Sequence, residues 1–476
     1  MSIALLKNFS YYTLGQLITQ LLSLLLLPLY LIKLSVEEYG IVASLMSVSI
    51  FLNALMQYGI CPAIMRFYYD FEKKSKEFSG FFTSLLVYTI ISNLILICFL
   101  FFFSNEVFNY FLPNIDITKY FWYIVLYSLL YYFSLLNLTF FRIESKPRKY
   151  LLFNIIQFII SFLLIFYLVA IEEQGAYGKI KGEFYARIPL FIAGIFLFRK
   201  YLNFKEIRFY YIKQGLGYSI PLMFQAILWW SLYKLDYFLI NIKLGVESVG
   251  LYNFAFQLSF LLISLGISFS LAWTPHFYSI ARKMKTKLFY GNLIGNFLMI
   301  LVFFAVIFLI FVSDVLSLLN AKQYFPTLSF IPYLLIGGIF QASYYIIHQL
   351  LLYKKKTILI PMILIPGLAF TFTIEYLLIE DYGLIGISIV KAAGFIFIFL
   401  ATLLAGLKYY YFKLNMKKIF IAICLLIINF LIISAINIRD FKLIFKLLLM
   451  LLNVLVIFKL KFFTQNEISF VRNIFK

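Results

Sequence analysis

The most telling shortage in this sequence is of charged residues. Only 13% of the 476 residues are Asp, Glu, Lys or Arg, whereas 64% are hydrophobic. An average soluble domain carries about 25% charged and about 45–50% apolar residues. A soluble chain of this composition would expose large apolar patches and aggregate. The sequence therefore excludes a soluble protein and predicts an all-α, polytopic membrane protein.

Cysteine and histidine are also scarce. Cys61, Cys98 and Cys424 lie in or beside apolar segments, and no pair has the spacing of metal ligands or of a disulfide framework. His276 and His348 stand alone on their segments. The sequence contains no phosphate-binding loop, nucleophile elbow or paired-carboxylate arrangement. We therefore expect no metal, no cofactor and no enzymatic activity.

Long apolar runs are abundant instead. A helix needs about 20 apolar residues to cross the hydrocarbon core, and the runs between charged or turn-forming breaks predict about 14 such helices. They are expected at 8–32, 41–62, 80–103, 119–141, 151–171, 178–198, 215–241, 249–273, 289–312, 327–352, 357–378, 384–404, 419–436 and 443–461. The sixth is the least apolar. The connections are short, so no segment outside the membrane is large enough to fold as a catalytic domain.

Positive charge is unevenly distributed along the chain. The formal net charge is +21, and Lys and Arg concentrate at 66–78, 142–150, 199–214, 274–288, 353–356, 405–418 and 459–476, which follow every second span. The positive-inside rule places these segments and both termini in the cytoplasm. Because the cations lie between apolar runs and not on a soluble face, we expect a membrane protein that binds no nucleic acid.

One motif occurs twice at an offset of 210 residues. Residues 32–40 read IKLSVEEYG and residues 242–250 read IKLGVESVG, and a weaker echo places YG at 177–178 and at 382–383. The offset covers an even number of predicted helices, so the two halves are expected to be parallel repeats related by an axis along the membrane normal.

The repeat predicts the domain organisation. We expect two pseudo-symmetric six-helix lobes, residues 1–205 (helices 1–6) and 213–405 (helices 7–12). Two additional transmembrane helices at 419–461 and a cytoplasmic tail at 462–476 would follow. Two such lobes would enclose a central cleft that opens to either side by rocking, which is the architecture of a transporter.

Polar side chains follow one face of several predicted helices, because residues three or four apart share a helix face. These stripes lie on the first, second, seventh and eighth spans, which are equivalent in the repeat. The candidate lumen-lining residues are Gln16, Gln20, Asn53, Gln57, Gln225, Asn253 and Gln257. Polar contacts that hold packed helices together are the alternative explanation.

Charged residues within the spans are more informative, since an ionised side chain at mid-membrane costs about 2.5–3.5 kcal/mol and normally faces water or a partner. Lys179, Glu183 and Arg187 are spaced i, i+4, i+8 and form one stripe. Lys234 and Asp236 are two residues apart and cannot face each other on a helix, so each is expected to face another helix or water. Ion pairs that only lock helices together are the alternative.

Further charges complete the set of candidates. Lys391 and Glu375 are expected at similar depth on adjacent spans. Three arginines lie at cytoplasmic ends of spans. Their guanidinium groups could pair bidentately with a pyrophosphate or simply fix the topology. The candidates for a cationic lumen or vestibule are Arg66, Arg142, Arg187, Lys234, Arg282 and Lys391. Those for ion coupling are Asp236, Glu183 and Glu375.

Six short stretches carry a family resemblance: NFSYYTLGQLITQLLSLLLLPLYLIKLSVEEYGIVASL (8–45), YGICPAIMRFY (58–68), GYSIPLMFQAILWWSLYKLDYFLI (217–240), VGLYNFAFQL (249–258), AWTPHFY (272–278) and YGLIGISIVKA (382–392). They resemble the polysaccharide-transporter branch of the multidrug/oligosaccharidyl-lipid/polysaccharide exporter superfamily. Arg66 and Asp236 occupy the matching charged positions. The glycine-rich pattern near Gly178 is degraded by the charges around it.

The resemblance implies a flippase in the cytoplasmic (inner) membrane that carries undecaprenyl-pyrophosphate-linked oligosaccharide repeat units, the precursors of O-antigen or capsule, to the outer leaflet. It also implies two lobes that face each other across a cationic lumen, with alternating access driven by a proton or sodium gradient. The implied partners are the lipid-linked substrate, the coupling ion, membrane lipid and polysaccharide polymerase machinery. The protein is expected to act as a monomer.

Two other functions are compatible with a polytopic membrane protein. A drug/cation antiporter of the same superfamily would require a net acidic cavity, whereas the charges within the spans are predominantly basic. An integral-membrane glycosyltransferase or polysaccharide polymerase would require a catalytic carboxylate or an arginine loop on the external face. Glu37 and Glu38 form an acid pair, but their loop is short and has a repeat counterpart at Glu247.

Overall fold

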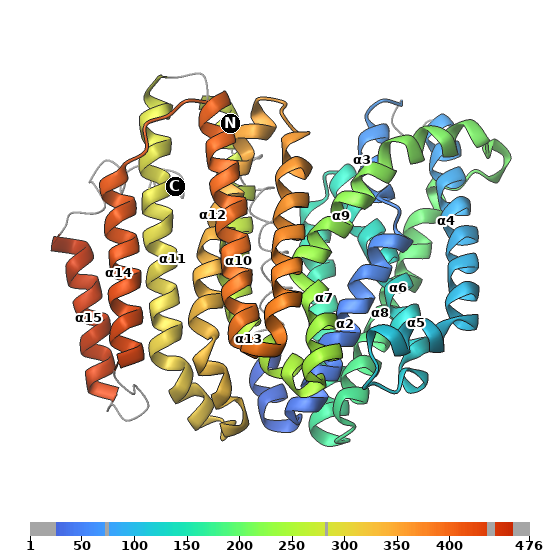
Figure 1. Ribbon diagram of the computed structural model, residues 1–476. Coiled ribbons are helices and arrows are strands. Elements are labelled where there is room, and N and C mark those ends of the chain that lie inside the picture. The colour runs from blue at the N-terminus through green and yellow to red at the C-terminus, as the bar shows by residue number, and fades with distance from the viewer. Residues whose placement is uncertain (1–24, 72–75, 281–283, 436–442, 460–476) are drawn as a thin grey trace. The chain divides into compact units, whose positions relative to one another are not determined.

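The computed structural model describes residues 25–71, 76–280, 284–435 and 443–459 (Figure 1). Over these ranges the regular elements are all helical, with no strand, which confirms the all-α prediction. Eight of the described helices are long and apolar enough to cross a membrane. This number is consistent with about 14 spans, because one 51-residue helix covers two predicted spans and others carry charges that lower their hydropathy.

The chain forms two compact units, Met1–Asn253 and Phe254–Lys476. The helices of the first unit are α2 (Val36–Met56), α3 (Ile60–Tyr68), α4 (Lys76–Phe102), α5 (Ser104–Phe111), α6 (Phe121–Ile143), α7 (Pro147–Phe166), α8 (Gly175–Phe198), α9 (Phe209–Leu244) and the first turns of α10 (Val246–Ile280). The short turns are η1 (Ile117–Lys119), η2 (Tyr167–Ile171), η3 (Arg199–Tyr201) and η4 (Phe204–Glu206). Helix α6 packs on α2 and α8, and α9 packs on α2, α3 and α4. The division into lobes at 205–213 stays a prediction, since it rests on sequence symmetry and not on packing.

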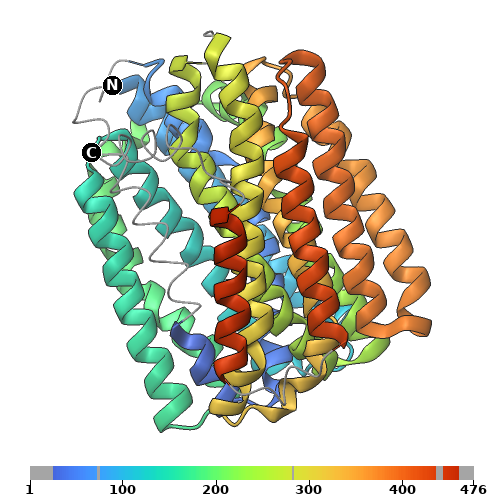
Figure 2. The same cartoon turned by 90° about the vertical axis from the view of Figure 1, so that its left-hand side faces the viewer.

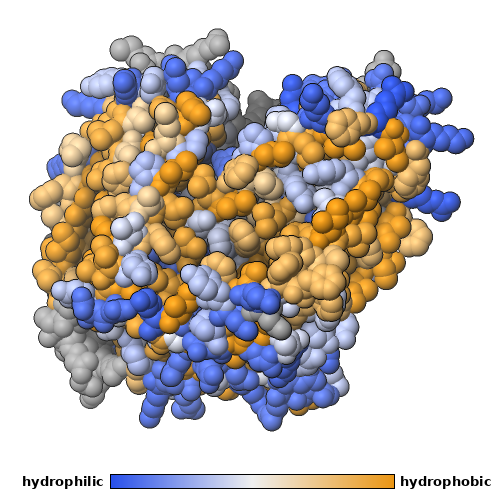
Figure 3. Space-filling model, turned by 45° about the vertical axis from the view of Figure 1, so that its right-hand side comes forward, coloured by the Kyte–Doolittle hydropathy of each residue, from blue (hydrophilic) through white to orange (hydrophobic). Residues whose placement is uncertain are grey.

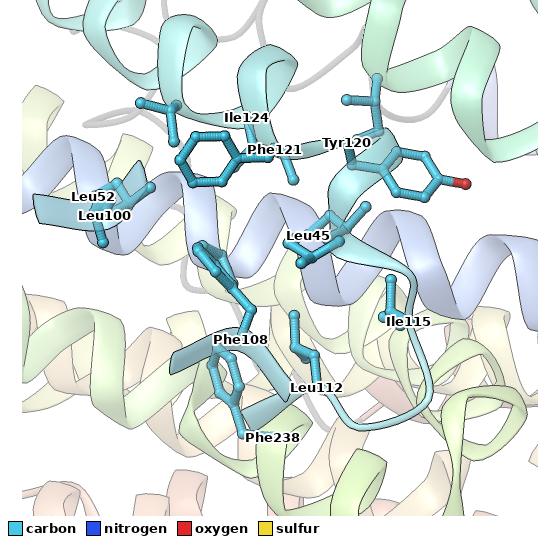
Figure 4. Close-up of a cluster of buried hydrophobic side chains, with 14 of the residues drawn as sticks. Leu45, Leu52, Leu100, Phe108, Leu112, Ile115, Tyr120, Phe121, Ile124 and Phe238 are labelled. Carbon is cyan, nitrogen blue, oxygen red and sulfur yellow. The ribbon is translucent and has the colours of Figure 1, made fainter. Parts of the chain in front are cut away.

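An apolar cluster fixes α5 in the first unit. Phe108 of α5 and Leu112, which directly follows the helix, pack among buried side chains of α2, α6 and α9, including Phe121 and Phe238 (Figure 4). Their i, i+4 spacing puts both on the same face. Segment 104–118, which the sequence suggests is a plain connection, therefore contributes to the core.

The two copies of the repeated motif meet at a close helix crossing. A Cβ atom on Gly40 of α2 would lie only 2.0 Å from the carbonyl oxygen of Val246, and one on Gly250 of α10 would lie 2.1 Å from that of Val36. Each contact is the other shifted by 210 positions, so the motif copies are related by a local two-fold axis. Such an approach of two backbones requires glycine, because any side chain would overlap the carbonyl.

The second unit continues with α10. Its further helices are α11 (Met284–Leu318), η5 (Lys322–Ser329), α12 (Ile331–Tyr353), α13 (Leu359–Tyr409), α14 (Met416–Ala435) and α15 (Leu443–Lys459). Gly383 divides α13 into two helices, because its φ of 54° and ψ of −141° are not helical. A residue with a side chain would be strained there. The predicted spans 357–378 and 384–404 are thus one hairpin.

Polar contacts attach the last two helices of the second unit. Helix α11 packs on α14 and α15 (Figure 2). The Lys446 ammonium of α15 lies 2.7 Å from a carboxylate oxygen of Asp314 on α11. Asn429 and Asn453 donate to each other's carbonyl oxygens at 2.8 and 2.9 Å, which joins α14 to α15. Such amide pairs stabilise helix association in lipid.

The exposed surface has the character of a protein that faces lipid. Figure 3 shows a hydrophobic band with hydrophilic residues gathered above and below it. Helix α4, for example, leaves Ile91, Leu94 and Ile95 between 53% and 65% exposed. These features, together with the apolar helices, confirm a multi-pass membrane protein.

Candidate functional site

The charged stripe predicted on the sixth span lies on α8. The Lys179 ammonium is 3.1 Å from a carboxylate oxygen of Glu183, one helical turn away, and both side chains are at most 13% exposed. Arg187 follows one turn later. A carboxylate between two cations reduces the cost of placing charge in a low-dielectric region.

Arg187 is held against two tyrosines of α6. Its guanidinium lies 4.6 Å from the centre of the Tyr131 ring and 5.5 Å from that of Tyr127. This cation–π arrangement fixes the guanidinium plane and leaves N–H groups for a further acceptor. Within the part of the chain that the structure describes, its Nε is buried and has no hydrogen-bond partner. Arg187 is therefore a positioned cation that can bind an anion.

A second polar group lies on the α9–α10 hairpin of the same unit. Gly245, with a φ of 86°, ends α9 and lets the chain enter α10 at once. This turn places residues 16 apart side by side, and the Tyr252 hydroxyl donates a hydrogen bond to Asp236 at 2.5 Å. Asp236 is 1% exposed. The candidate coupling carboxylate is thus enclosed in the helical hairpin.

Lys234 contacts a tyrosine on its own helix, and that it faces another helix or water stays a prediction. Its ammonium donates to the Tyr237 hydroxyl at 2.9 Å and lies 4.0 Å from the centre of that ring. The Tyr237 hydroxyl in turn donates to the Asn253 side-chain oxygen at 2.9 Å. Asn253 also hydrogen-bonds Tyr39 of α2. The network therefore connects two predicted site residues through tyrosines.

Sequence reasoning missed these tyrosines. Tyr127, Tyr131, Tyr237 and Tyr252 all contact predicted charged residues. Aromatic residues make up 21% of the chain, so a single tyrosine in a span carries little signal. The usable signal is the spacing of Tyr127 and Tyr131, four residues apart on the helix face that turns toward α8.

In the second unit, the hairpin within α13 brings Glu375 and Lys391 to the same level. A Cβ atom on Gly394 would lie 2.0 Å from the Thr371 hydroxyl, so the two halves of α13 are in close contact there. Glu375 lies four residues after Thr371, and Lys391 three before Gly394, in antiparallel halves. Both side chains are 2% exposed. Their roles in coupling and in substrate binding stay predictions.

The predicted polar lumen residues occupy mixed environments. The Asn53 amide donates to the backbone oxygen of Ser128 at 3.2 Å, which joins α2 to α6. Gln57, Gln225 and Gln257 are half-buried. Gln16 and Gln20 lie outside the described residues. The lining of a lumen by these residues stays a prediction.

The predicted vestibule arginines lie apart from the α8 stripe. Arg66 pairs with Asp70 one turn later at 2.5 Å, and both side chains are exposed. Arg142 lies at the end of α6, 5.9 Å from the centre of the Tyr150 ring. Arg282 lies outside the described residues. The vestibule stays a prediction.

A carboxylate that sequence reasoning overlooked organises the end of the first unit. Glu144, at the turn between α6 and α7, accepts from Lys146, Lys200 and Tyr201. Burial raises the pKa of this carboxyl, but the hydrogen bonds from these three groups outweigh burial and lower the pKa from 4.5 to about 2. Glu144 therefore fastens the segment that links α8 to α9.

We expect the Glu144→Gln variant to unfold at lower temperature than the wild type at pH 7. A lowered pKa means that the stabilisation is fully present above pH 4.5 and is lost as the pH falls towards 2. After screening by solvent it amounts to about 1–2 kcal/mol. Thermal unfolding of the purified chain between pH 7 and pH 2 measures this. The difference between wild type and variant should shrink below pH 4.5, and a difference that is independent of pH would contradict the assignment.

Comparisons with known proteins agree with this arrangement of helices. The family described as "Polysaccharide biosynthesis protein" matches residues 5–281. A protein of the Lsg locus of Haemophilus influenzae is 26% identical over 403 residues, which cover 80% of this chain and 94% of that protein. Among solved structures, the lipid II flippase MurJ in an inward closed conformation aligns with a TM-score of 0.75 at 14% identity, over 98% of this chain and 99% of that one. The Vibrio cholerae MATE transporter VcmN aligns with a TM-score of 0.56 at 15% identity, over 85% and 96%.

Proposed function

Because the chain belongs to the polysaccharide biosynthesis protein family, as its resemblance to the polysaccharide transporters predicts, we propose that it is a flippase for lipid-linked glycans. The substrate in this proposal is an undecaprenyl-pyrophosphate-linked oligosaccharide repeat unit of O-antigen or capsule. The chain moves it from the cytoplasmic to the outer leaflet of the inner membrane, with both termini in the cytoplasm. The fold shared with MurJ and MATE structures supports transport as the general activity.

Arg187 is the observation that carries the proposal. A pyrophosphate that crosses the membrane region needs a cation there, because the charge is otherwise costly to desolvate. A guanidinium binds phosphate oxygens bidentately. Arg187 presents such a group within the first unit, fixed on two tyrosine rings.

Alternating access and coupling complete the proposal. An ion gradient can drive the cycle only if a group inside the membrane binds the ion in one conformation and releases it in another. The buried carboxylates Asp236 and Glu375 and the stripe residue Glu183 are the candidates for binding a proton or sodium ion. Lys234 and Lys391 add positive charge beside two of them.

Replacing Arg187 by glutamine should slow transport about tenfold, because a charge-assisted hydrogen bond to a phosphate is worth about 1.5–3 kcal/mol. We expect lipid-linked repeat units to accumulate on the cytoplasmic side of cells that depend on this chain. Surface glycan should fall in parallel. The conservative Arg187→Lys variant, which keeps the charge but not the bidentate geometry, should be intermediate.

Arg199→Gln is the matched control. Arg199 is exposed in η3, just beyond the end of α8, so its loss removes the same charge without touching the stripe. It should support normal surface glycan. Normal glycan in Arg187→Gln cells with equal amounts of protein would refute the assignment of Arg187.

A further inference from the structure

Two lysines and three tyrosines gather where α6 and α8 begin. The Lys119 ammonium lies 4.9 Å from the centre of the Tyr177 ring and 5.7 Å from that of Tyr120. The Lys181 ammonium lies 5.6 Å from the same Tyr177 ring. Tyr177 donates to the Tyr123 hydroxyl at 3.0 Å, with the rings edge to face at 5.4 Å. We call these five residues the tyrosine–lysine cluster.

The cluster places two positive charges around one aromatic ring. Two like charges beside one ring repel each other, so an anion that approaches both would be stabilised by both. The nearest carboxylates serve the backbone instead. Asp116 accepts from the Thr118 N–H to cap η1, and Glu38 closes the capping box of α2. Neither ammonium has a carboxylate partner within the described ranges of the chain.

The cluster is rigid at its base and open at its surface. Tyr120 is 6% exposed and belongs to the apolar cluster around α5, where it is labelled in Figure 4. Tyr123 and Tyr177 pack against the same core and are half-buried, whereas Lys119 is exposed. Lys181 is half-buried. The rings are therefore held in place beside one exposed and one half-buried lysine side chain.

We infer that the tyrosine–lysine cluster binds an acidic sugar of the transported glycan. The apolar C–H face of a pyranose can stack on an aromatic ring, and the Tyr123 and Tyr177 hydroxyls can hydrogen-bond its hydroxyl groups. The two ammonium groups bind the carboxylate of the sugar through charge-assisted hydrogen bonds. The inference rests on the proposed function and narrows it, because it selects glycans that contain a sugar acid.

Tyrosines and lysines near a membrane surface also occur as anchors for the interface, and lysines there attract anionic lipid headgroups. Two features favour glycan binding over a role as an interface anchor. Both lysines lie over rings instead of extending freely, and the Tyr177–Tyr123 hydrogen bond brings two hydroxyl groups together beside them. An interface anchor requires neither arrangement.

Binding can be measured separately from transport. We would place the full chain in phosphatidylcholine nanodiscs, whose headgroups carry no net charge, and record saturation-transfer NMR with cellobiouronic acid and with cellobiose. These disaccharides differ by one carboxylate. Cellobiouronic acid should bind at least about tenfold more tightly, since one charge-assisted hydrogen bond is worth about 1.5–3 kcal/mol.

Variants locate the site. Lys119→Gln and Lys181→Gln should each weaken binding of cellobiouronic acid about tenfold and leave cellobiose unchanged. Tyr177→Leu should weaken both sugars. Lys33→Gln is the control, because Lys33 pairs with Glu173 at 2.8 Å and lies outside the cluster. Unfolding temperatures would exclude misfolded variants.

The outcomes separate this inference from the proposed function. Equal binding of both sugars, or an equal loss in Lys33→Gln, would overturn the acidic-sugar site. A second result would also overturn the acidic-sugar site. If binding of cellobiouronic acid is lost when phosphatidylglycerol is added to the nanodiscs, and Tyr177→Leu has no effect, the lysines bind lipid headgroups. A chain that transports lipid-linked glycans but does not distinguish the two disaccharides would keep the proposed function and refute the acidic-sugar site.

Discussion

Alanine in place of Gly40 or Gly250 is expected to reduce transport to the level of cells that lack the chain. Either methyl group would lie about 2 Å from a backbone carbonyl oxygen of the facing helix, a distance that real Cβ atoms essentially never show. The neighbour is backbone and cannot rotate away, so α2 and α10 must separate. Forced overlap in a packed region costs about 1–3 kcal/mol. If alternating access includes this crossing, that cost removes one of the two required conformations.

The reciprocal geometry makes the experiment specific. Gly40→Ala and Gly250→Ala should have the same effect, because each contact is the image of the other. Gly217→Ala in α9 is the control, since a Cβ atom there would meet nothing within 4 Å. Surface glycan, lipid-linked intermediates and the unfolding temperature would be measured for all three. Wild-type transport in both crossing variants would show that this approach is dispensable.

The second large effect is expected at Asp236. Asp236→Asn keeps the size of the side chain and can still accept the Tyr252 hydrogen bond, but it removes the negative charge. If Asp236 binds the coupling ion, the variant should bind substrate and fail to accumulate it against a gradient. Net transport should then fall to background. The unfolding temperature should change little, because removal of a buried charge also removes its desolvation cost.

Two further variants distinguish a coupling role of Asp236 from a purely structural one. Asp70→Asn removes a carboxylate that pairs with Arg66 on an exposed turn, and it should have no effect on transport. Tyr252→Phe removes the donor but keeps the carboxylate, so it should lower transport without abolishing it. Asp236→Asn cells with normal surface glycan would refute the coupling role.

Much of the fold could be predicted because lipid imposes simple rules. Backbone groups in a membrane must be satisfied internally, so long apolar runs become helices. The predicted spans correspond to helices such as α2, α6 and α12. The repeated IKL motif could be recognised in the sequence because both copies keep the glycine, Gly40 or Gly250, that the close approach of α2 and α10 requires. That segment 104–118 contributes to the core could not be predicted, since only the packing of Phe108 and Leu112 distinguishes it from an exposed loop.

The candidate site was predictable in part. The stripe of Lys179, Glu183 and Arg187 follows from helical spacing, and the structure shows its ion pair. The division between Lys234 and Asp236 follows in the same way. Tyr237 lies three residues after Lys234 on the same helix, so spacing could have linked this pair. The tyrosines that contact Arg187 come from another helix, and the one that contacts Asp236 lies across a hairpin, so no spacing rule links them.

Composition and periodicity by themselves determined that the chain is a bundle of apolar helices, that one motif occurs twice, and which helix faces carry charge. These properties are local, because burial of the backbone and helical spacing act over a few residues. Tertiary structure alone decided which rings lie beside Arg187, that Glu144 holds a linker far along the chain, and that two distant glycines come close to the facing backbone. Contacts of this kind depend on how separate helices pack, and many different packings satisfy the same hydrophobic pattern.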